Sequence, residues 1–418
     1  MLSLFRSLPA EYRRNLLCLA GAALLFWSSM ASQLPVLSLY VRHVGGNDSQ
    51  VGLVMGAFAI GLLLSRRQLG VMADRRGRRS VLLIGAAVAT IAPIGYALAS
   101  SIPLLVLVRV FHGLSIAAFT TGYSALVVDL SPPDRKGELI GYMTLTQPVG
   151  VAVGPALGSY LQTSFGFWPT FAMAAIFGMG AVLGMTFIRE QARPPEPIAT
   201  ADHPRDDRFW GKLAAPPLRT PALVMLAIGL VFGTLSTFVP LLIVESRVNL
   251  IPGLFYSAAA VASFGARFLS GRQSDRLGRG SFITLSLVCY VAAMGLLSRA
   301  ESVEGFVLAA LLEGLGAGLL IPTMVALVSD RVPAEERGRS FSLVLLGFDL
   351  GIAISGPGLG TVSDALGYRV LFEIAAGLAL VALLLFLTLS SKTIGRSIQF
   401  ALGRSPDVYA LAPTDPRG

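Results

Sequence analysis

The sequence has little charge and very few cysteines, and both shortages exclude whole classes of protein. Only 14% of the 418 residues are charged, 54% are hydrophobic, and the mean hydropathy is +0.70. Because an ordinary globular domain carries about a quarter charged residues, a soluble chain of this composition could not cover its surface. Cys18 and Cys289 both lie in apolar runs, so they indicate neither a disulfide framework nor a metal site. We therefore expect a polytopic membrane protein with no metal and no cofactor.

Motifs for nucleotide binding and catalysis are also missing. The sequence contains no G-x-x-x-x-G-K-[ST] phosphate loop, which argues against transport driven directly by ATP. It contains no catalytic constellation, so we do not expect an enzyme. The net charge of +9 could suggest nucleic acid. However, the arginines stand in short loops between apolar runs, so we expect no nucleic-acid partner.

Apolar runs of membrane-spanning length occur twelve times. About 20 apolar residues cross a bilayer as a helix, and helices are expected because the backbone must satisfy its own hydrogen bonds there. The expected spans are 15–40, 49–69, 80–99, 103–128, 138–162, 167–189, 221–245, 253–271, 281–299, 303–328, 339–363 and 369–391. The first run is too long for the core of a signal peptide. The predicted fold is all-α, with two pseudo-symmetric six-helix bundles.

The distribution of basic residues predicts the orientation. With both termini in the cytoplasm, 28 of the 33 Lys and Arg lie on the cytoplasmic side or at its boundary, as the positive-inside rule requires. We expect a monomer in the cell inner (plasma) membrane, with a polar, loose tail. The predicted segments are a cytoplasmic N-terminal segment 1–14, bundles 15–189 and 221–391, a cytoplasmic linker 190–220 with a short helix near 209–213, and a cytoplasmic tail 392–418.

A basic stretch between two apolar runs occurs twice. Six of the fourteen residues from Arg66 to Arg79 are arginine, and a similar pattern returns 201 residues later. The matched pairs are Arg66 and Arg267, Gly70 and Gly271, Asp74 and Asp275, Arg75 and Arg276, Gly77 and Gly278, and Arg78 and Arg279. The same offset relates Gly52 to Gly253 and Asp129 to Asp330. Two similar halves with a site between them are typical of secondary transporters.

The motif Gly70-x-x-x-Asp74-Arg75-x-Gly77-Arg78-Arg79 resembles the signature that the major facilitator superfamily carries between its second and third helices. The resemblance covers nearly the full chain, and it implies that Asp74 docks on helix 11 and helps close the cytoplasmic side. We expect Gly70 to allow close helix packing and Gly77 to permit the turn. The alternative is a hairpin that only fixes the topology. The gating candidates are Gly70, Asp74, Arg75, Gly77, Arg78, Asp129, Asp275, Arg276, Arg279 and Asp330.

The fifth expected helix carries an unusual set of small residues. Its pattern contains Gly141, Gly150, Gly154, Pro155 and Gly158, and a blurred copy follows in helix 11. Glycines four residues apart give a smooth face for close helix approach, and proline weakens the helix. The pattern resembles the antiporter signature of proton-coupled exporters. A packing seam without directional meaning is the alternative.

Four ionisable residues lie inside apolar helices: Arg109, His112, Glu313 and Asp349. Such residues are costly in the membrane unless they are paired or hydrated, so we regard them as candidates for proton or ion coupling. Related exporters have Arg-x-x-Gln-Gly where this chain has Arg109-x-x-His112-Gly. His112 is therefore either a neutral substitute or a group that titrates near pH 6.5. Static salt bridges from the carboxylates to Arg109 are the alternative role.

The fold implied by the resemblance places helices 1, 4, 7 and 10 around a substrate cavity. The candidates on these helices are Trp27, Ser32, Gln33, Phe119, Tyr123, Thr234, Thr237 and Phe238. Aromatic rings beside hydroxyls suit amphipathic organic molecules, and would suit a sugar nearly as well. Individually, each residue is more often a packing residue than a ligand contact.

These observations predict a secondary transporter that exports small amphipathic molecules by alternating access, driven by the proton gradient. A sugar or metabolite exporter, or a symporter of the same superfamily, is the second hypothesis. A membrane receptor that does not transport is the third, although the chain carries only a 30-residue linker and a short tail in place of an output domain.

Overall fold

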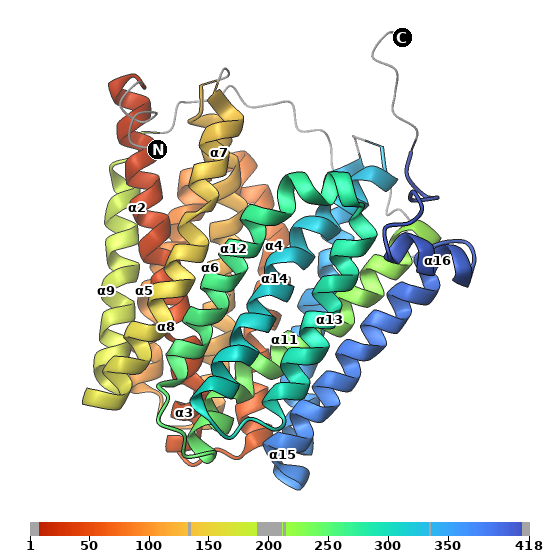
Figure 1. The fold of residues 1–418 in the computed structure, drawn as a ribbon. Helices are drawn as coiled ribbons and strands as arrows, with labels where there is room; N and C mark the ends of the chain where they lie inside the picture. Colours follow the sequence, from red (N-terminus) through yellow and green to blue (C-terminus); the bar gives the residue numbers. More distant parts are fainter. Residues whose placement is uncertain (1–7, 133–134, 190–210, 212–214, 334–335, 412–418) are drawn as a thin grey trace. The chain divides into compact units, whose positions relative to one another are not determined.

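A computed structural model describes residues 8–132, 135–189, 211, 215–333 and 336–411, without the side chains of residues 268–276. Every regular element in this part of the chain is a helix (Figure 1). The helices are α2 Ala10–Ser32, α3 Leu34–His43, α4 Asp48–Arg76, α5 Arg78–Leu98, α6 Ile102–Asp129, α7 Lys136–Thr144, α8 Thr146–Phe165, α9 Phe167–Thr186, α11 Pro216–Glu245, α12 Pro252–Leu277, α13 Arg279–Leu297, α14 Val303–Arg331, α15 Arg337–Leu389 and α16 Ile394–Ala401.

The helical prediction is confirmed, while the count of twelve membrane spans stays a prediction. Nine spans in the described residues are long and apolar enough to cross a membrane. One of them joins α2 and α3, and another is α15, whose 53 residues cover two of the expected spans. Gly367 breaks the helical backbone of α15, with φ 79° and ψ 171°.

The turns that end these helices repeat between the two halves of the sequence. Gly77 has φ 90° and its repeat partner Gly278 has φ 89°. Gly166 and Gly367, which are also 201 residues apart, have φ values of 87° and 79°. Because side chains disfavour positive φ, glycine fits each turn, and the prediction for Gly77 is confirmed.

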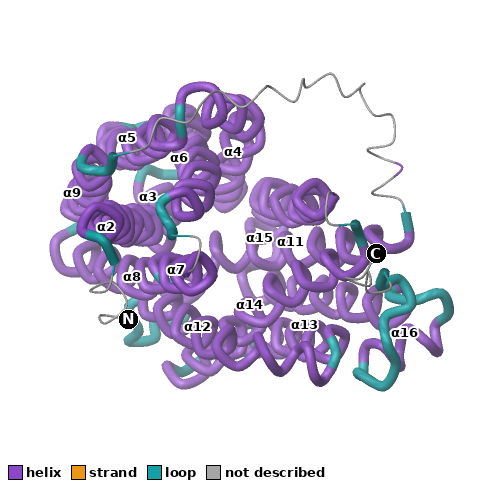
Figure 2. The backbone as a smooth tube through the Cα atoms, turned by 90° about the horizontal axis from the view of Figure 1, so that it is seen from above, coloured by secondary structure: helices purple, strands orange, loops and turns teal. Residues whose placement is uncertain are grey.

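The chain separates into two compact units. The first contains α2 to α9 together with segments 236–260 and 356–364 of the second half. The second contains the rest of α11, α12 and α15, together with α13, α14 and α16. In the view along the helices, α2, α5, α6, α8 and α9 lie side by side (Figure 2). The predicted boundaries of the two bundles stay a prediction.

The prediction of a loose tail was wrong. After Leu389 the chain forms α16, capped by the Thr393 hydroxyl, which accepts a hydrogen bond from the Arg396 amide. Phe400 and Ala401 are buried, and the Ala401 carbonyl accepts a hydrogen bond of 2.8 Å from the hydroxyl of Thr284 on α13. The sequence signal was the spacing of apolar residues in a short segment that reads as polar overall. The short helix expected near residues 209–213 falls largely outside the described residues.

Candidate functional site

The matched arginines Arg78 and Arg279, one at the end of each basic hairpin, are both tied to the following helix. Arg78 forms an ion pair with Asp129 and donates a hydrogen bond of 2.8 Å to the Ala125 carbonyl. Its repeat partner Arg279 lies 3.2 Å from the carboxylate of Asp330. Both members of each pair belong to the same half of the sequence, so a movement of one half relative to the other would leave these pairs intact. Their place in gating stays a prediction.

The remaining hairpin residues are more open. Asp74 and Arg75 are exposed, and within the described part of the chain the Asp74 carboxylate has no ion pair. A Cβ added at Gly70 would meet nothing within 4 Å, so the expected close packing at Gly70 is wrong for this conformation. The side chains of Asp275 and Arg276 lie outside the described residues.

The glycines of the fifth expected helix form a seam against the first helix. A Cβ added at Gly150, Gly154 or Gly158 would lie 2.7 Å, 2.6 Å and 2.2 Å from atoms of α2, the last two being backbone oxygens. Backbones that approach this closely exclude any side chain at these positions. Gly141 is not part of the seam, because its added Cβ meets nothing within 4 Å.

The second half has the equivalent seam between α15 and α11. A Cβ at Gly351 would lie 2.4 Å from the Leu226 carbonyl oxygen, and one at Gly347 would lie 2.6 Å from that of Ala222. The start of α12 repeats the start of α4 as well. An added Cβ at Gly253 would lie 1.9 Å from the Pro155 oxygen, just as one at Gly52 would from the Gly356 oxygen.

Arg109 and His112 are buried together in the core of the first unit. Arg109 is 7% exposed, and its guanidinium carbon lies 4.5 Å from the centre of the Phe58 ring, a distance at which cation–π attraction acts. His112 is fully buried, with Nδ1 3.0 Å from the Tyr96 hydroxyl and Nε2 3.1 Å from the Met30 sulfur. One neutral tautomer accounts for both contacts, because Nδ1 then accepts from Tyr96 while Nε2–H faces the sulfur.

Glu313 occupies the repeat position of His112 in the second unit. It is 5% exposed on α14, and Tyr290 of α13, which is 2% exposed, packs against Gly316 one turn further along α14. Among the side chains that the structure describes, Glu313 has no cationic partner. A carboxylate buried without a cation favours its protonated form. Asp349, the other carboxylate candidate, is only half-buried on α15.

Most of the residues predicted to line the cavity are buried in the protein interior. Phe119 is fully buried and stacks on Phe26 with ring centres 3.7 Å apart. The Tyr123 hydroxyl donates to the Met143 carbonyl at 2.8 Å, next to the break between α7 and α8. The other buried candidates are Ser32, Gln33, Thr234, Thr237 and Phe238, whereas Trp27 is half-buried.

Sequence reasoning missed a contact at the start of α4. The carboxylate of Asp364 accepts hydrogen bonds of 2.9 Å from the amides of Asp48 and Ser49. The Ser363 hydroxyl donates to the Asp48 carboxylate at 2.9 Å. A carboxylate at a helix N-terminus interacts favourably with the free amides there. The available signal was the capping box of Asn47 and Gln50, which marks the helix start but not its partner.

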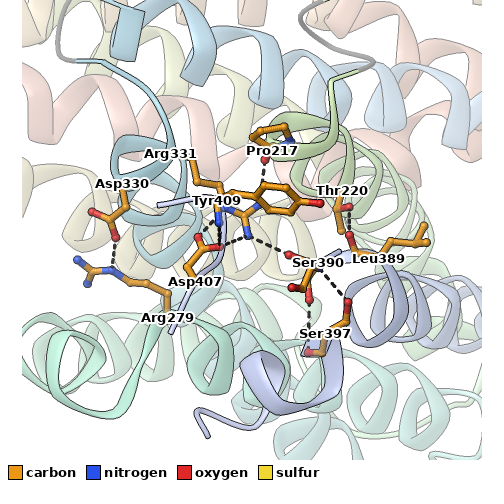
Figure 3. A network of polar contacts seen from close by, with 11 residues as sticks. Pro217, Thr220, Arg279, Asp330, Arg331, Leu389, Ser390, Ser397, Asp407 and Tyr409 are labelled. Carbon is orange, nitrogen blue, oxygen red and sulfur yellow. Dashed lines mark hydrogen bonds and ion pairs between the residues drawn. The ribbon is translucent and has the colours of Figure 1, made fainter. Parts of the chain in front are cut away.

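Sequence reasoning also missed Arg331, which holds the tail in place (Figure 3). Its guanidinium donates to both oxygens of Asp407, at 2.7 Å and 3.1 Å. It also donates to the Pro217 carbonyl at 2.8 Å and to the Ser390 carbonyl at 3.2 Å. The side chain of Arg331 is 0% exposed. A single buried cation therefore joins the start of α11, the end of α15 and the tail.

Comparisons with known proteins agree with the geometry. The family model of the Major Facilitator Superfamily matches residues 19–298 and 250–408. The multi-drug resistance efflux pump PmrA of Streptococcus pneumoniae is 25% identical over 82% of this chain and 88% of its own length. The multidrug resistance protein MdtG of Enterobacter lignolyticus is 26% identical over 88% of this chain and 90% of its own.

Solved transporters share the fold. A nucleoside transporter, NupG, superposes with a TM-score of 0.74 over 88% of this chain and 98% of its own, at 15% identity. A POT family transporter superposes with a TM-score of 0.76 over 92% of this chain and 98% of its own, at 16% identity. Together with the repeated hairpins and seams, these matches show that the chain belongs to the Major Facilitator Superfamily and is a membrane transporter that resembles the drug:proton antiporters.

Proposed function

We propose that the chain exports small amphipathic organic molecules across the inner membrane in exchange for protons. The export direction is supported by two relatives named as multidrug efflux or resistance proteins, and by the glycine seam of α8 on α2. The observation that carries proton coupling is Glu313, which is 5% exposed in an apolar helix without a cationic partner among the described side chains.

Glu313 takes up a proton when it is buried and releases it when water reaches it, because burial disfavours the charged carboxylate. A transporter that alternately buries and hydrates this group changes its proton affinity in each cycle. Arg109 and His112 have a different task in this scheme. His112 stays neutral between Tyr96 and Met30, and Arg109 supplies a fixed positive charge near the middle of the membrane. Asp349 is the second candidate for carrying the proton.

Transport by purified protein in liposomes tests the coupling. We expect Glu313→Gln to abolish efflux of a cationic dye driven by a pH gradient, while dye exchange without net proton movement continues. Glu304→Gln is the matched control, since Glu304 is exposed at the start of the same helix. If Glu313→Gln and Asp349→Asn both keep wild-type efflux driven by the pH gradient, these carboxylates are structural and proton antiport is wrong.

Alternating access further requires contacts that form on one side of the membrane and break on the other. We assign the outer contact to Asp364 and the start of α4, and the cytoplasmic contact to Asp74 of the hairpin. Asp364→Asn then favours the outward-open state and Asp74→Asn the inward-open state. Each substitution removes about 1–3 kcal/mol of stabilisation from the state that its contact closes. A change of only about 1.4 kcal/mol shifts the ratio of the two states tenfold.

Double electron–electron resonance measures both effects with one label pair. Spin labels at Glu138 and Ser342, both exposed, report the distance between the expected cytoplasmic ends after Cys18 and Cys289 are replaced by serine. The two variants should shift this distance in opposite directions. Shifts in the same direction would contradict the assignment, and no shift for Asp74→Asn would reduce the hairpin to a topology signal.

The proposed orientation has a separate test. A cysteine at exposed His43 should react with an impermeant reagent in intact cells, whereas cysteines at exposed Lys136 and Gln399 should react only after the cytoplasmic side is opened. If the cysteine at position 399 reacts in intact cells, the orientation is the opposite of the one proposed.

The alternative functions differ in which compounds the protein would carry across the membrane. A sugar or metabolite transporter would give gradient-driven flux of those solutes and none of the dye. A receptor would bind ligand and give no flux of any compound.

A further inference from the structure

A basic pocket lies in the first unit where α2 and α5 begin and α9 ends. It has a volume of about 260 Å³ and is lined by Arg14, Arg79, Thr186, Phe187, Ile188 and Arg189. Three of these six residues are arginines and none is acidic. Like charges repel when they converge, so a cavity with this lining is suited to an anion.

Part-buried and exposed hydrogen bonds hold the backbone of Arg189 and the side chain of Arg79 at the cavity. Asn15, which is 2% exposed, donates to the Arg189 carbonyl at 3.1 Å and accepts from the Arg189 amide at 3.3 Å. This pairing sets Arg189 beside Arg14, the neighbour of Asn15 in the sequence. Arg79 donates to the carbonyls of Met185 and Thr186 at 3.0 Å and 2.7 Å. The wall of the pocket is therefore built by contacts between three helices.

The surface next to the pocket is apolar. Leu17 on α2 is 51% exposed, Leu183 on α9 is 55% exposed, and Phe187, which lines the pocket, is 66% exposed. In a membrane protein such side chains face the acyl chains. A ligand that fits both surfaces has an anionic head and an apolar body, and a basic pocket between membrane helices on the cytoplasmic side has the chemistry of a lipid headgroup site.

The second half of the chain fills the equivalent place with its own tail. The repeat partner of Arg79 is Gly280, and an added Cβ there would lie 2.0 Å from the Phe400 carbonyl oxygen. The tail also brings the carboxylate of Asp407 to Arg331. The second unit thus closes this end with a peptide segment and an anion from the same chain, whereas the described residues of the first unit leave a cavity lined by three arginines.

We propose that the pocket of Arg14, Arg79 and Arg189 binds the phosphodiester group of an anionic phospholipid, with the acyl chains along the exposed face of α2 and α9. Arg14 and Arg189 are both exposed, so they are free to turn towards the phosphate. Arg79 contributes charge while it keeps its bonds to the end of α9.

Native mass spectrometry of the full chain with added dioleoyl phosphatidylglycerol tests this site. We expect Arg14→Gln/Arg189→Gln to weaken binding of the lipid roughly tenfold or more, since each basic residue near a lipid surface contributes on the order of a fivefold change. The matched control is Arg219→Gln/Arg404→Gln, which removes the same charge from two exposed positions of the second unit and should change binding less than about twofold.

The other outcomes each contradict the proposal. Equal loss in both double variants would mean a general effect of charge, and no lipid binding by the wild type would leave the pocket without this ligand. Glycerol phosphate or inorganic phosphate that binds as tightly as the lipid would indicate a soluble anion site. Because binding is measured without transport, the result does not depend on proton antiport.

Discussion

The two halves of this transporter share a scaffold but differ in the polar residues that the scaffold buries. At one repeat position, α6 carries His112 beside Tyr96, and α14 carries Glu313. The imidazole has a partner for each of its nitrogens, whereas the carboxylate has no cation among the described side chains. The equivalent helix position therefore holds a group with two side-chain contacts in one half and a buried carboxylate in the other, and only the proposed function makes that carboxylate the proton carrier.

The ends of the helices differ as well. The first unit leaves a basic pocket at the ends of α2, α5 and α9, and the second covers the equivalent ends with α16 and Asp407. Repetition thus preserves what backbone packing requires, namely glycine turns and glycine seams. Charged side chains are kept in the matched pairs Arg78–Asp129 and Arg279–Asp330 but differ at the other positions compared above. The following predictions test this distinction.

The largest effect is expected at Arg331, the buried cation that holds the tail of the second unit. Arg331 and Asp407 have side chains that are 0% and 10% exposed. Asp407→Asn leaves the guanidinium buried without its counter-charge, which costs about 3–5 kcal/mol. We expect a clear fall in the melting temperature of the purified chain and faster hydrogen exchange in α16.

A double variant separates the pair from general damage to the tail. Arg331→Met/Asp407→Leu removes both charges, and replacing a whole buried pair with apolar residues is much less destabilising than breaking it. A double variant as unstable as the sum of the two single variants would show that the charges do not act together.

Substitutions in the glycine seams should reduce stability less than breaking the Arg331–Asp407 pair, and they should do so in both halves. Gly158→Ala places a Cβ 2.2 Å from the Ser32 oxygen, so α8 must move from α2 at a cost of about 1–3 kcal/mol. Gly141→Ala on α7 is the control, since its Cβ meets nothing within 4 Å and alanine favours a helix by up to about 1 kcal/mol. Thermal unfolding of both variants measures the difference, and equal stability would mean that the seam adapts freely.

His112 offers a test of the neutral assignment. His112→Leu removes the acceptor of the buried Tyr96 hydroxyl, which costs about 1–3 kcal/mol. His112→Gln keeps an acceptor and should retain most of the stability and the dependence of transport on pH. If His112→Gln instead shifts the pH profile of efflux as Glu313→Gln does, the imidazole titrates during transport. Both halves then contribute a residue that binds the transported proton.

The sequence was sufficient for what repeats and insufficient for what does not. Gly77 and Gly278, or Asp129 and Asp330, could be found because the same offset carries the same residue and the same physical need. Arg331 and Asp407 are 76 residues apart and have no such repeat, so neither residue indicated the other. Asp364 was missed for a related reason, because its partner is a helix N-terminus, which has no residue type of its own.

The smallest effect is expected at the ion pairs that both halves share. Asp129 has a side chain that is 15% exposed beside Arg78, while Asp330 is 43% exposed beside Arg279. Water screens the more exposed pair, so Asp330→Asn should cost about 0–1 kcal/mol. Asp129→Asn should cost about 1–3 kcal/mol, because its hydrogen bonds are charge-assisted and better shielded.

Thermal unfolding of the two variants at low and high salt checks the order. Salt should erase more of the Asp330 effect than of the Asp129 effect. Equal losses with equal salt dependence would show that burial does not distinguish these pairs, and that repetition fixed their energies along with their positions.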